Sequence, residues 1–190
     1  MGMEPSSPLE NQFLIALPQL DDPSFARSVT LICRHDADGA MGIVINRPSD
    51  YRFAEILSQL GIADPQGELS LREVLLGGPV HPERGFVLHL DDGRDFDSTL
   101  RVSERLKLTT SRDILEAMAQ GTGPSRTLLA LGCAGWGPGQ LEGEISANSW
   151  LTVPADERVL FELPLEQRWN ASAALIGVDL RLLTDYAGRA

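Results

Sequence analysis

The residues best placed to do chemistry lie in a glycine-dense segment near position 135. An apolar run, Thr127 to Leu131, leads into Gly132-Cys133-Ala134-Gly135-Trp136-Gly137-Pro138-Gly139, and a helix is expected to follow. A strand, a glycine turn and a helix start place backbone N–H groups where an anion or polar ligand can sit. Pro138 stands where a P-loop requires lysine, and the Rossmann spacing is also absent. Two interpretations stay open: a ligand-binding loop, and a buried turn whose glycines permit positive φ or close backbone approach.

A polar helix face beside this segment is a second candidate. Gln140, Glu144 and Asn148 are spaced at i, i+4 and i+8, so they share one face of the predicted helix. They either orient a ligand or cap neighbouring loops. Trp136 offers apolar contact to a partner. We therefore predict a surface that binds a small molecule or a protein, formed by Gly132, Gly135, Trp136, Gly139, Gln140, Glu144 and Asn148.

The two cysteines are the candidates for a reactive thiol. Cys33 and His35 alternate along a predicted strand, so both side chains should face one way and a thiol could meet an imidazole. A buried cysteine beside a strand-end histidine fits the same spacing. Cys133 stands where a nucleophile elbow carries its residue, but Leu131 occupies the place of the first glycine, which favours a small turn residue. Cys33 is kept as the candidate reactive thiol, and no catalytic residue is assigned.

Composition and charge exclude several classes of protein. The 190 residues include 27 acidic and 16 basic side chains, for a net charge of −11, and no basic stripe is visible. Arg101, Arg105 and Lys107 are interpreted as a solvated face. We therefore expect no direct binding to duplex DNA. The sequence has no apolar run long enough for a membrane span and no visible export signal, so we expect a cytoplasmic protein.

Metal sites, cofactors and disulfides are not expected. The two cysteines lie a hundred residues apart, which gives neither metal-ligand spacing nor a disulfide framework. This usage suits a reducing compartment. The aspartate pairs at 36 and 38 and at 91 and 92 precede glycine but lack the later ligands of a calcium loop, so turn chemistry explains them.

Hydrophobic periodicity predicts alternating short strands and helices. Strands are expected at residues 13–17, 29–33, 41–45, 73–76, 86–90, 127–131, 150–153 and 159–161. Helices are expected at residues 53–60, after a cap at Ser111, after the glycine-dense segment, and at 165–176 and 180–186. The strands at 29–33 and 41–45 should form a hairpin, and those at 73–76 and 86–90 another antiparallel pair. Hairpins mixed with helical crossovers favour one α+β domain over residues 11–190, after a flexible leader at 1–10.

Several longer motifs extend this description. They are Phe13-Leu14-Ile15-Ala16, Asp22-Pro23-x-Phe25, Ser28-Val29, Cys33-x-His35, Gly39-Ala40-Met41-Gly42-x-Val44-Ile45-Asn46-Arg47-Pro48, Gly77-Gly78-Pro79-Val80, Arg84-Gly85-Phe86-Val87-Leu88-His89, Gly135-Trp136-x-x-Gly139-Gln140-Leu141-Glu142, Asn148-x-Trp150-Leu151, Arg168-Trp169 and the terminal Tyr186-Ala187-Gly188-Arg189-Ala190. Across residues 11–190 the chain strongly resembles the AlgH/YqgE family.

The resemblance implies an α+β fold with a mixed, bent or bifurcated sheet, a small barrel-like core and flanking helices. Its members are bacterial cytosolic proteins often labelled transcriptional regulators, a label linked to alginate synthesis, and it implies no settled chemistry. Arg34 and Cys133 depart from the family pattern, which weakens the argument for a shared cysteine reaction.

Two functions compete on this basis. The first is a regulatory domain that binds a small ligand or a protein and acts as an indirect transcriptional regulator. The alternative is a small-molecule enzyme that uses the glycine-rich cleft with a cysteine or histidine. The missing cofactor motif and the missing triad count against the enzyme.

Overall fold

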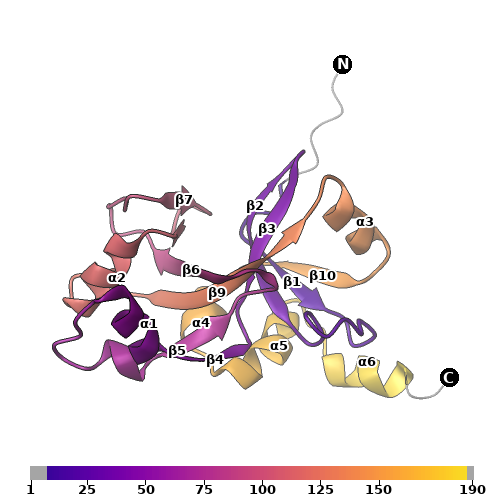
Figure 1. Ribbon diagram of the computed structural model, residues 1–190. Coiled ribbons are helices and arrows are strands. Elements are labelled where there is room, and N and C mark those ends of the chain that lie inside the picture. Colours follow the sequence, from indigo (N-terminus) through magenta and orange to yellow (C-terminus); the bar gives the residue numbers. More distant parts are fainter. Residues whose placement is uncertain (1–7, 188–190) are drawn as a thin grey trace. The chain divides into compact units, whose positions relative to one another are not determined.

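A computed structural model describes residues 8–187 and confirms the α+β class (Figure 1). The described chain divides into two compact units. The first unit comprises residues 8–46 and 134–187, and the second comprises residues 47–133. Strand β9 (Thr127–Trp136) contributes residues to both units. The expected leader lies mostly outside the described residues, and the single domain over 11–190 stays a prediction.

An antiparallel sheet forms the base of the first unit. Its strands follow the order β10–β1–β2–β3, and residues 134–136 of β9 pair with β3. The predicted hairpin is confirmed, with Asp36 opposite Gly39 at its tip. The elements of this unit are β1 (Gln12–Ala16), β2 (Val29–Asp36), β3 (Gly39–Val44), α3 (Gln140–Ser146), β10 (Trp150–Pro154), α4 (Glu157–Phe161), α5 (Leu165–Ala174) and α6 (Leu180–Ala187).

Two buried side chains attach α5 to this sheet. Trp169 donates its indole N–H to the carbonyl oxygen of Ala16 at 2.9 Å, and Arg168 donates to the carbonyl oxygen of Ile45 at 2.6 Å. Hydrogen bonds satisfy these polar groups away from water, which is the condition for burying them. The Arg168-Trp169 motif therefore has a structural role in the first unit.

The second unit is built on a mixed sheet. Its strands follow the order β4–β5–β9–β6–β8–β7, in which β5 and β9 are parallel and the other pairs antiparallel. Because β9 pairs with β3, β5 and β6, strand pairing branches at β9, as a bifurcated sheet requires. The other elements of this unit are β4 (Pro48–Arg52), α1 (Phe53–Leu60), the 3-10 helix η1 (Leu69–Leu71), β5 (Glu73–Leu76), β6 (Val80–Leu90), β7 (Thr99–Arg101), β8 (Leu106–Thr109) and α2 (Arg112–Ala119).

Helices α1 and α2 supply the core of the second unit. Phe53 and Leu57 of α1 and Ile114 of α2 are buried in one cluster with Val87 and Leu129 of the sheet. The predicted end of α1 is confirmed, because Gly61 adopts φ 67° and its N–H closes the last turn. The apolar spacing that predicted these helices therefore marks the faces that they bury.

Three local predictions were wrong. Residues 159–161 belong to helix α4, because Asp156 accepts a hydrogen bond from the Val159 N–H and starts a helix there. The predicted pair of strands at 73–76 and 86–90 does not form, since β9 lies between β5 and β6. The predicted turn at 132–136 is strand, because β9 continues to Trp136.

Candidate functional site

The residues of the predicted binding surface belong to both units. Gly132 belongs to the second unit, whereas Gly135, Trp136 and the α3 residues belong to the first. Gly135 is a strand residue paired with Met41, and Gly139 precedes α3 with φ 72°. The surface itself stays a prediction, and its members have the following local roles.

Gly132 and Trp136 have packing roles. A Cβ atom on Gly132 would lie 2.4 Å from the carbonyl oxygen of Gly78, and its φ is 77°. Trp136 is only 6% exposed, and its ring lies 6.0 Å from that of Phe25 and 6.3 Å from that of Trp150. The apolar surface that was expected to meet a partner is therefore used inside the first unit.

The polar face of α3 is partly confirmed. Gln140 accepts a hydrogen bond from the Gly137 N–H at 3.0 Å and donates to Glu144 at 3.4 Å. Asn148 lies beyond the helix with φ 58°, and its N–H bonds to the carbonyl of Ile145 while the Ser149 N–H bonds to that of Glu144. This is a Schellman motif, which places a residue of left-handed conformation after the helix. Asn148 therefore ends α3 through its backbone, a role that neither interpretation had named.

A bulge in β2 decides the environment of Cys33 and His35. Ile32 pairs with Gly42 and Arg34 with Met41, so Cys33 is the extra residue. Because a bulge interrupts side-chain alternation, the expected common face for the two residues is lost. His35 lies opposite Ala40, which packs in one buried cluster with Trp136 and with Leu141 of α3. His35 is therefore on the α3 side of the sheet. Cys33 is buried, with its thiol 3.6 Å from the Leu31 carbonyl.

His35 has partners that sequence reasoning missed. Its Nδ1 accepts a hydrogen bond from the Leu9 N–H at 3.0 Å, and its Nε2 contacts the carboxylate of Glu142 on α3. Both ring nitrogens are thus bonded, with Nδ1 as an acceptor and Nε2 placed to donate to the carboxylate. His35 and Glu142 both occur in the sequence motifs. Their contact joins residues 107 positions apart, so no pattern of neighbouring residues could have predicted it.

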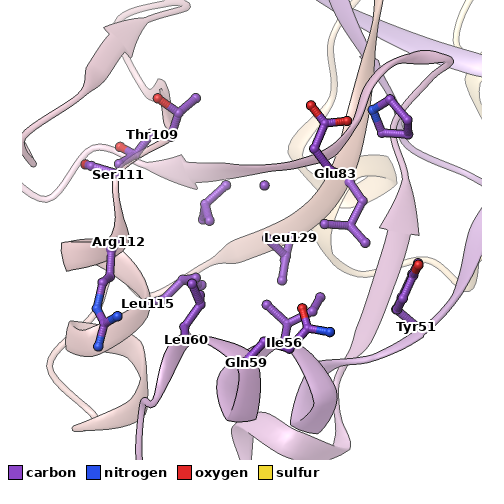
Figure 2. A pocket seen from close by; sticks show the side chains of 15 residues that line it. Tyr51, Ile56, Gln59, Leu60, Glu83, Thr109, Ser111, Arg112, Leu115 and Leu129 are labelled. Carbon is purple, nitrogen blue, oxygen red and sulfur yellow. The ribbon is translucent and has the colours of Figure 1, made fainter.

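The second unit contains a pocket that no sequence pattern had indicated. Its volume is about 300 Å³, and it lies over the sheet face that carries Gly85, Val87 and Thr109 (Figure 2). The remaining lining comes from α1, α2, β9 and neighbouring segments, and consists of Tyr51, Ile56, Gln59, Leu60, Pro82, Glu83, Thr110, Ser111, Arg112, Leu115, Leu129 and Leu131. Because these residues are scattered over 80 positions, only the fold brings them together.

The pocket has an aliphatic floor and a polar margin. Leu129, Leu60 and Ile56 lie between Glu83 and Arg112, which Figure 2 shows at opposite sides. Arg112 also pairs with Glu116, one helical turn later, at 2.6 Å. An apolar interior with few polar groups at its edge is the usual composition of a small-molecule site.

A buried histidine, His89, contacts Thr109, which lines this pocket. His89 is fully buried, with Nε2 2.7 Å from the Thr109 hydroxyl and Nδ1 3.1 Å from the carbonyl oxygen of Leu90. The carbonyl accepts from Nδ1, so Nε2 accepts from Thr109. Burial lowers the pKa of His89, against smaller effects of the opposite sign from the Leu90 bond and Asp92. The imidazole is consequently neutral at pH 7.

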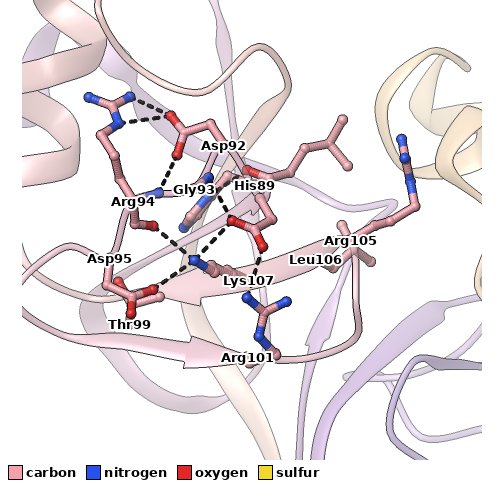
Figure 3. A network of polar contacts seen from close by, with 12 residues as sticks. His89, Asp92, Gly93, Arg94, Asp95, Thr99, Arg101, Arg105, Leu106 and Lys107 are labelled. Atoms are coloured by element: carbon pink, nitrogen blue, oxygen red, sulfur yellow. Dashed lines mark hydrogen bonds and ion pairs between the residues drawn. The ribbon is translucent and has the colours of Figure 1, made fainter.

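Lys107 lies on the same sheet face. Arg101 and Arg105 are exposed as expected, but Lys107 is buried, so the expectation that it is solvated was wrong. Its ammonium contacts Asp95 at 2.7 Å and Asp91 at 3.0 Å, and its side chain is 4% exposed (Figure 3). The hydrogen bond from the Gly93 N–H is the main cause that lowers the pKa of Asp91, followed by the bonds from Arg101 and Lys107. The Asp91 turn is thus a structural ion-pair network, consistent with the turn chemistry expected there.

The His89 environment predicts a pH-dependent stability. In the unfolded chain a histidine has a pKa of about 6.5, so below that pH the unfolded state binds a proton that folded His89 resists. Stability should therefore be full above about pH 6.5 and fall as the pH is lowered toward 5. Urea unfolding at pH 5, 6 and 7 should show a smaller decrease for His89→Gln than for wild type. His81→Gln, at an exposed position, is the control, and equal decreases in all three proteins would contradict the assignment.

Residues 8–187 contain neither a metal-binding cluster nor a membrane-spanning helix. No three histidine, cysteine, aspartate or glutamate side chains there are grouped to hold a metal ion. None of the helices in that range has the length and apolar character needed to cross a bilayer.

Comparison with known proteins gives consistent matches along the chain. The family model described as AlgH-like matches residues 13–181. A UPF0301 protein of Stenotrophomonas maltophilia strain R551-3 is 61% identical over 188 residues, 99% of each chain. A UPF0301 protein of Xanthomonas axonopodis pv. citri is 62% identical over 184 residues, 97% of each chain.

Two solved structures have a similar fold. The solution structure of the AlgH protein from Pseudomonas aeruginosa has a TM-score of 0.80 and 49% identity over 97% of both chains. A crystal structure of a Corynebacterium diphtheriae protein has a TM-score of 0.71 and 25% identity over 95% of this chain and 93% of that one. The family model, the relatives and the folds agree, and the chain belongs to the AlgH-like family.

Proposed function

We propose that this protein is a cytoplasmic regulatory domain whose second unit binds a small molecule. The single observation that carries the proposal is the pocket of about 300 Å³ over the sheet of that unit. The pocket opens to solvent at a margin that includes the exposed Tyr51, Glu83 and Arg112. Ligand sites typically occupy about 300 to 1,000 Å³ and combine an apolar lining with a few polar groups.

Binding is favoured over cysteine chemistry. A nucleophilic cysteine reacts as the thiolate, and sites that use one lower its pKa. Burial raises the pKa of the Cys133 thiol, and a smaller effect of Arg84 in the other direction does not reverse this. Cys33 is buried in the first unit. These environments support inert packing thiols.

An indirect role in transcription is part of the proposal. A net charge of −11 opposes contact with a phosphate backbone, so a regulatory effect would pass through a protein partner. Gln140, which is exposed, and Glu144, which is partly exposed, stay part of our predicted partner surface.

The binding site can be tested by filling the pocket. Gly85 lines it, has no positive φ, and would place a Cβ atom 3.6 Å from Leu129, which is an ordinary contact. Gly85→Val should therefore fold and occupy part of the space with its methyl groups. In an NMR titration with n-hexanol, wild type should show saturable chemical-shift changes at the amides that line the pocket. The variant should bind n-hexanol at least about tenfold more weakly, because its two methyl groups take the space of about two methylene groups of the ligand.

Gly137→Val is the matched control. Gly137 is exposed, has no positive φ and lies beside α3 in the first unit. It should bind n-hexanol as wild type does. Undiminished binding by Gly85→Val, or shifts that concentrate on α3 and vanish in Gly137→Val, would reject the pocket as the site.

A further inference from the structure

We propose that the pocket of the second unit takes an aliphatic molecule that carries an ammonium group, with Glu83 and Tyr51 receiving the charge. This inference rests on the proposed function and specifies its ligand. Its basis is the chemical difference between the floor of the pocket and the two sides of its margin.

The floor selects an aliphatic group. It is made by Leu129 and Leu131 of β9, Ile56 and Leu60 of α1, and Leu115 of α2, with no aromatic ring among them. Branched aliphatic side chains bury a flexible hydrocarbon chain without the flat surfaces that stack on planar rings. Each methylene that leaves water strengthens binding by a factor of about four. Affinity would therefore come from the hydrocarbon part and selectivity from the margin.

The charge of Arg112 is already compensated. Its Nε donates to Glu116 at 2.6 Å, and this i, i+4 pair lies on one face of α2. A ligand carboxylate at this side would have to compete with Glu116 for the guanidinium. The Arg112 side of the pocket is thus poorly suited to attract an anion.

Glu83 carries the less compensated charge. The one side chain paired with it among the described residues is His81, whose Nδ1 is 3.9 Å away, beyond hydrogen-bond distance. Arg84, the next residue, is directed to the ring of Phe86, 5.8 Å from its centre. Phe86 and Val87 are successive strand residues, so that ring faces away from the pocket side of the sheet. The Glu83 carboxylate is left able to accept an ammonium group.

Tyr51 adds a second feature that favours a cation. It is 53% exposed, and Figure 2 shows it across the floor from Arg112. The face of a tyrosine ring attracts cations. The overall charge of −11 raises the local concentration of cations around the molecule as well.

Three probes of equal chain length test the inference. n-Hexylamine and n-hexanol share one hexyl group, so the difference between their affinities reports the head group alone. Hexanoate has a pentyl group beside its carboxylate, so its affinity is compared after allowing a factor of about four for the missing methylene. At pH 7.5 and low salt, n-hexylammonium should bind wild type about tenfold more tightly than n-hexanol, from an exposed ion pair and a cation–π contact. Hexanoate should bind most weakly. The preference should shrink severalfold at 0.5 M salt, because exposed charges are screened.

Glu83→Gln should remove most of the preference for the amine and leave the affinity for n-hexanol unchanged. Glu104→Gln, at an exposed position outside the pocket, is the matched control for the loss of one negative charge. If hexanoate binds best, or if Glu83→Gln keeps the full preference, the inference is wrong. Equal binding of all three probes overturns the ligand class but leaves the proposed site intact, whereas no binding of any probe removes both.

Discussion

Trp136→Ala should lower the free energy of unfolding by about 3 to 5 kcal/mol, the usual cost of truncating a buried tryptophan. The indole is 6% exposed and lies in one cluster with Trp150, Phe25 and Leu141. Its ring is 6.3 Å from that of Trp150 and nearly perpendicular to it, so the truncation also removes an edge-to-face contact. Chemical denaturation followed by circular dichroism measures the change.

Gln140→Ala is the matched control four residues later. Gln140 is exposed and bonds only to Gly137 and Glu144 among the described residues, so its loss should cost about 1 kcal/mol or less. If Trp136→Ala keeps wild-type stability but loses a co-purifying protein or metabolite, Trp136 acts in binding. If Gln140→Ala loses that partner while remaining folded, the α3 surface is supported independently of Trp136.

The contrast between these two residues shows what local patterns can predict. Helix α1 and the β2–β3 hairpin were predicted because a few neighbouring residues determine them: apolar spacing with Gly61 in one, turn residues between apolar runs in the other. The burial of Trp136 depends on Phe25 and Trp150, which are distant in the sequence. A glycine-rich strand and a glycine-rich loop also have the same composition, so nothing in the neighbouring sequence argued against interpreting residues 132–136 as a loop.

Short apolar runs were the other source of error. Val159, Leu160 and Phe161 are compatible with a strand by composition, and three residues are too few to show a period. The helix begins there because Asp156 caps it and Pro164 follows its end. The cap at Asp156 and the proline at position 164 outweigh the β propensity of the apolar residues, because β propensity is weak and depends on context.

The candidate pocket could not be predicted from the sequence, for a physical reason. Its floor consists of ordinary core residues such as Leu115 and Leu129, whose periodicity indicates burial but not an unfilled space beside them. Volume between elements depends on how helices and sheet are packed, and no single segment encodes it. Glu83 could be recognised as exposed but not as the margin of a pocket.

Gly132→Ala should be among the most destabilising single substitutions in the second unit, with a loss of at least about 3 kcal/mol. The new Cβ atom would lie 2.4 Å from the carbonyl oxygen of Gly78, a distance that Cβ atoms do not tolerate, and 3.2 Å from Pro82. These contacts are with backbone atoms, so no side chain can rotate away. The φ of 77° adds a cost of about 1 to 2 kcal/mol for a residue with a Cβ.

Gly121→Ala separates the two causes. Gly121 has the same φ of 77°, belongs to the same unit, and would place its Cβ in open space. Its substitution should cost only the conformational term, about 1 to 2 kcal/mol. The difference between the two variants in the free energy of unfolding, measured with urea, therefore gives the cost of the steric clash between the new Cβ atom and the Gly78 backbone. If Gly132→Ala is no more destabilising than Gly121→Ala, the packing role of Gly132 is wrong, and its glycine is better explained by the ligand-binding interpretation.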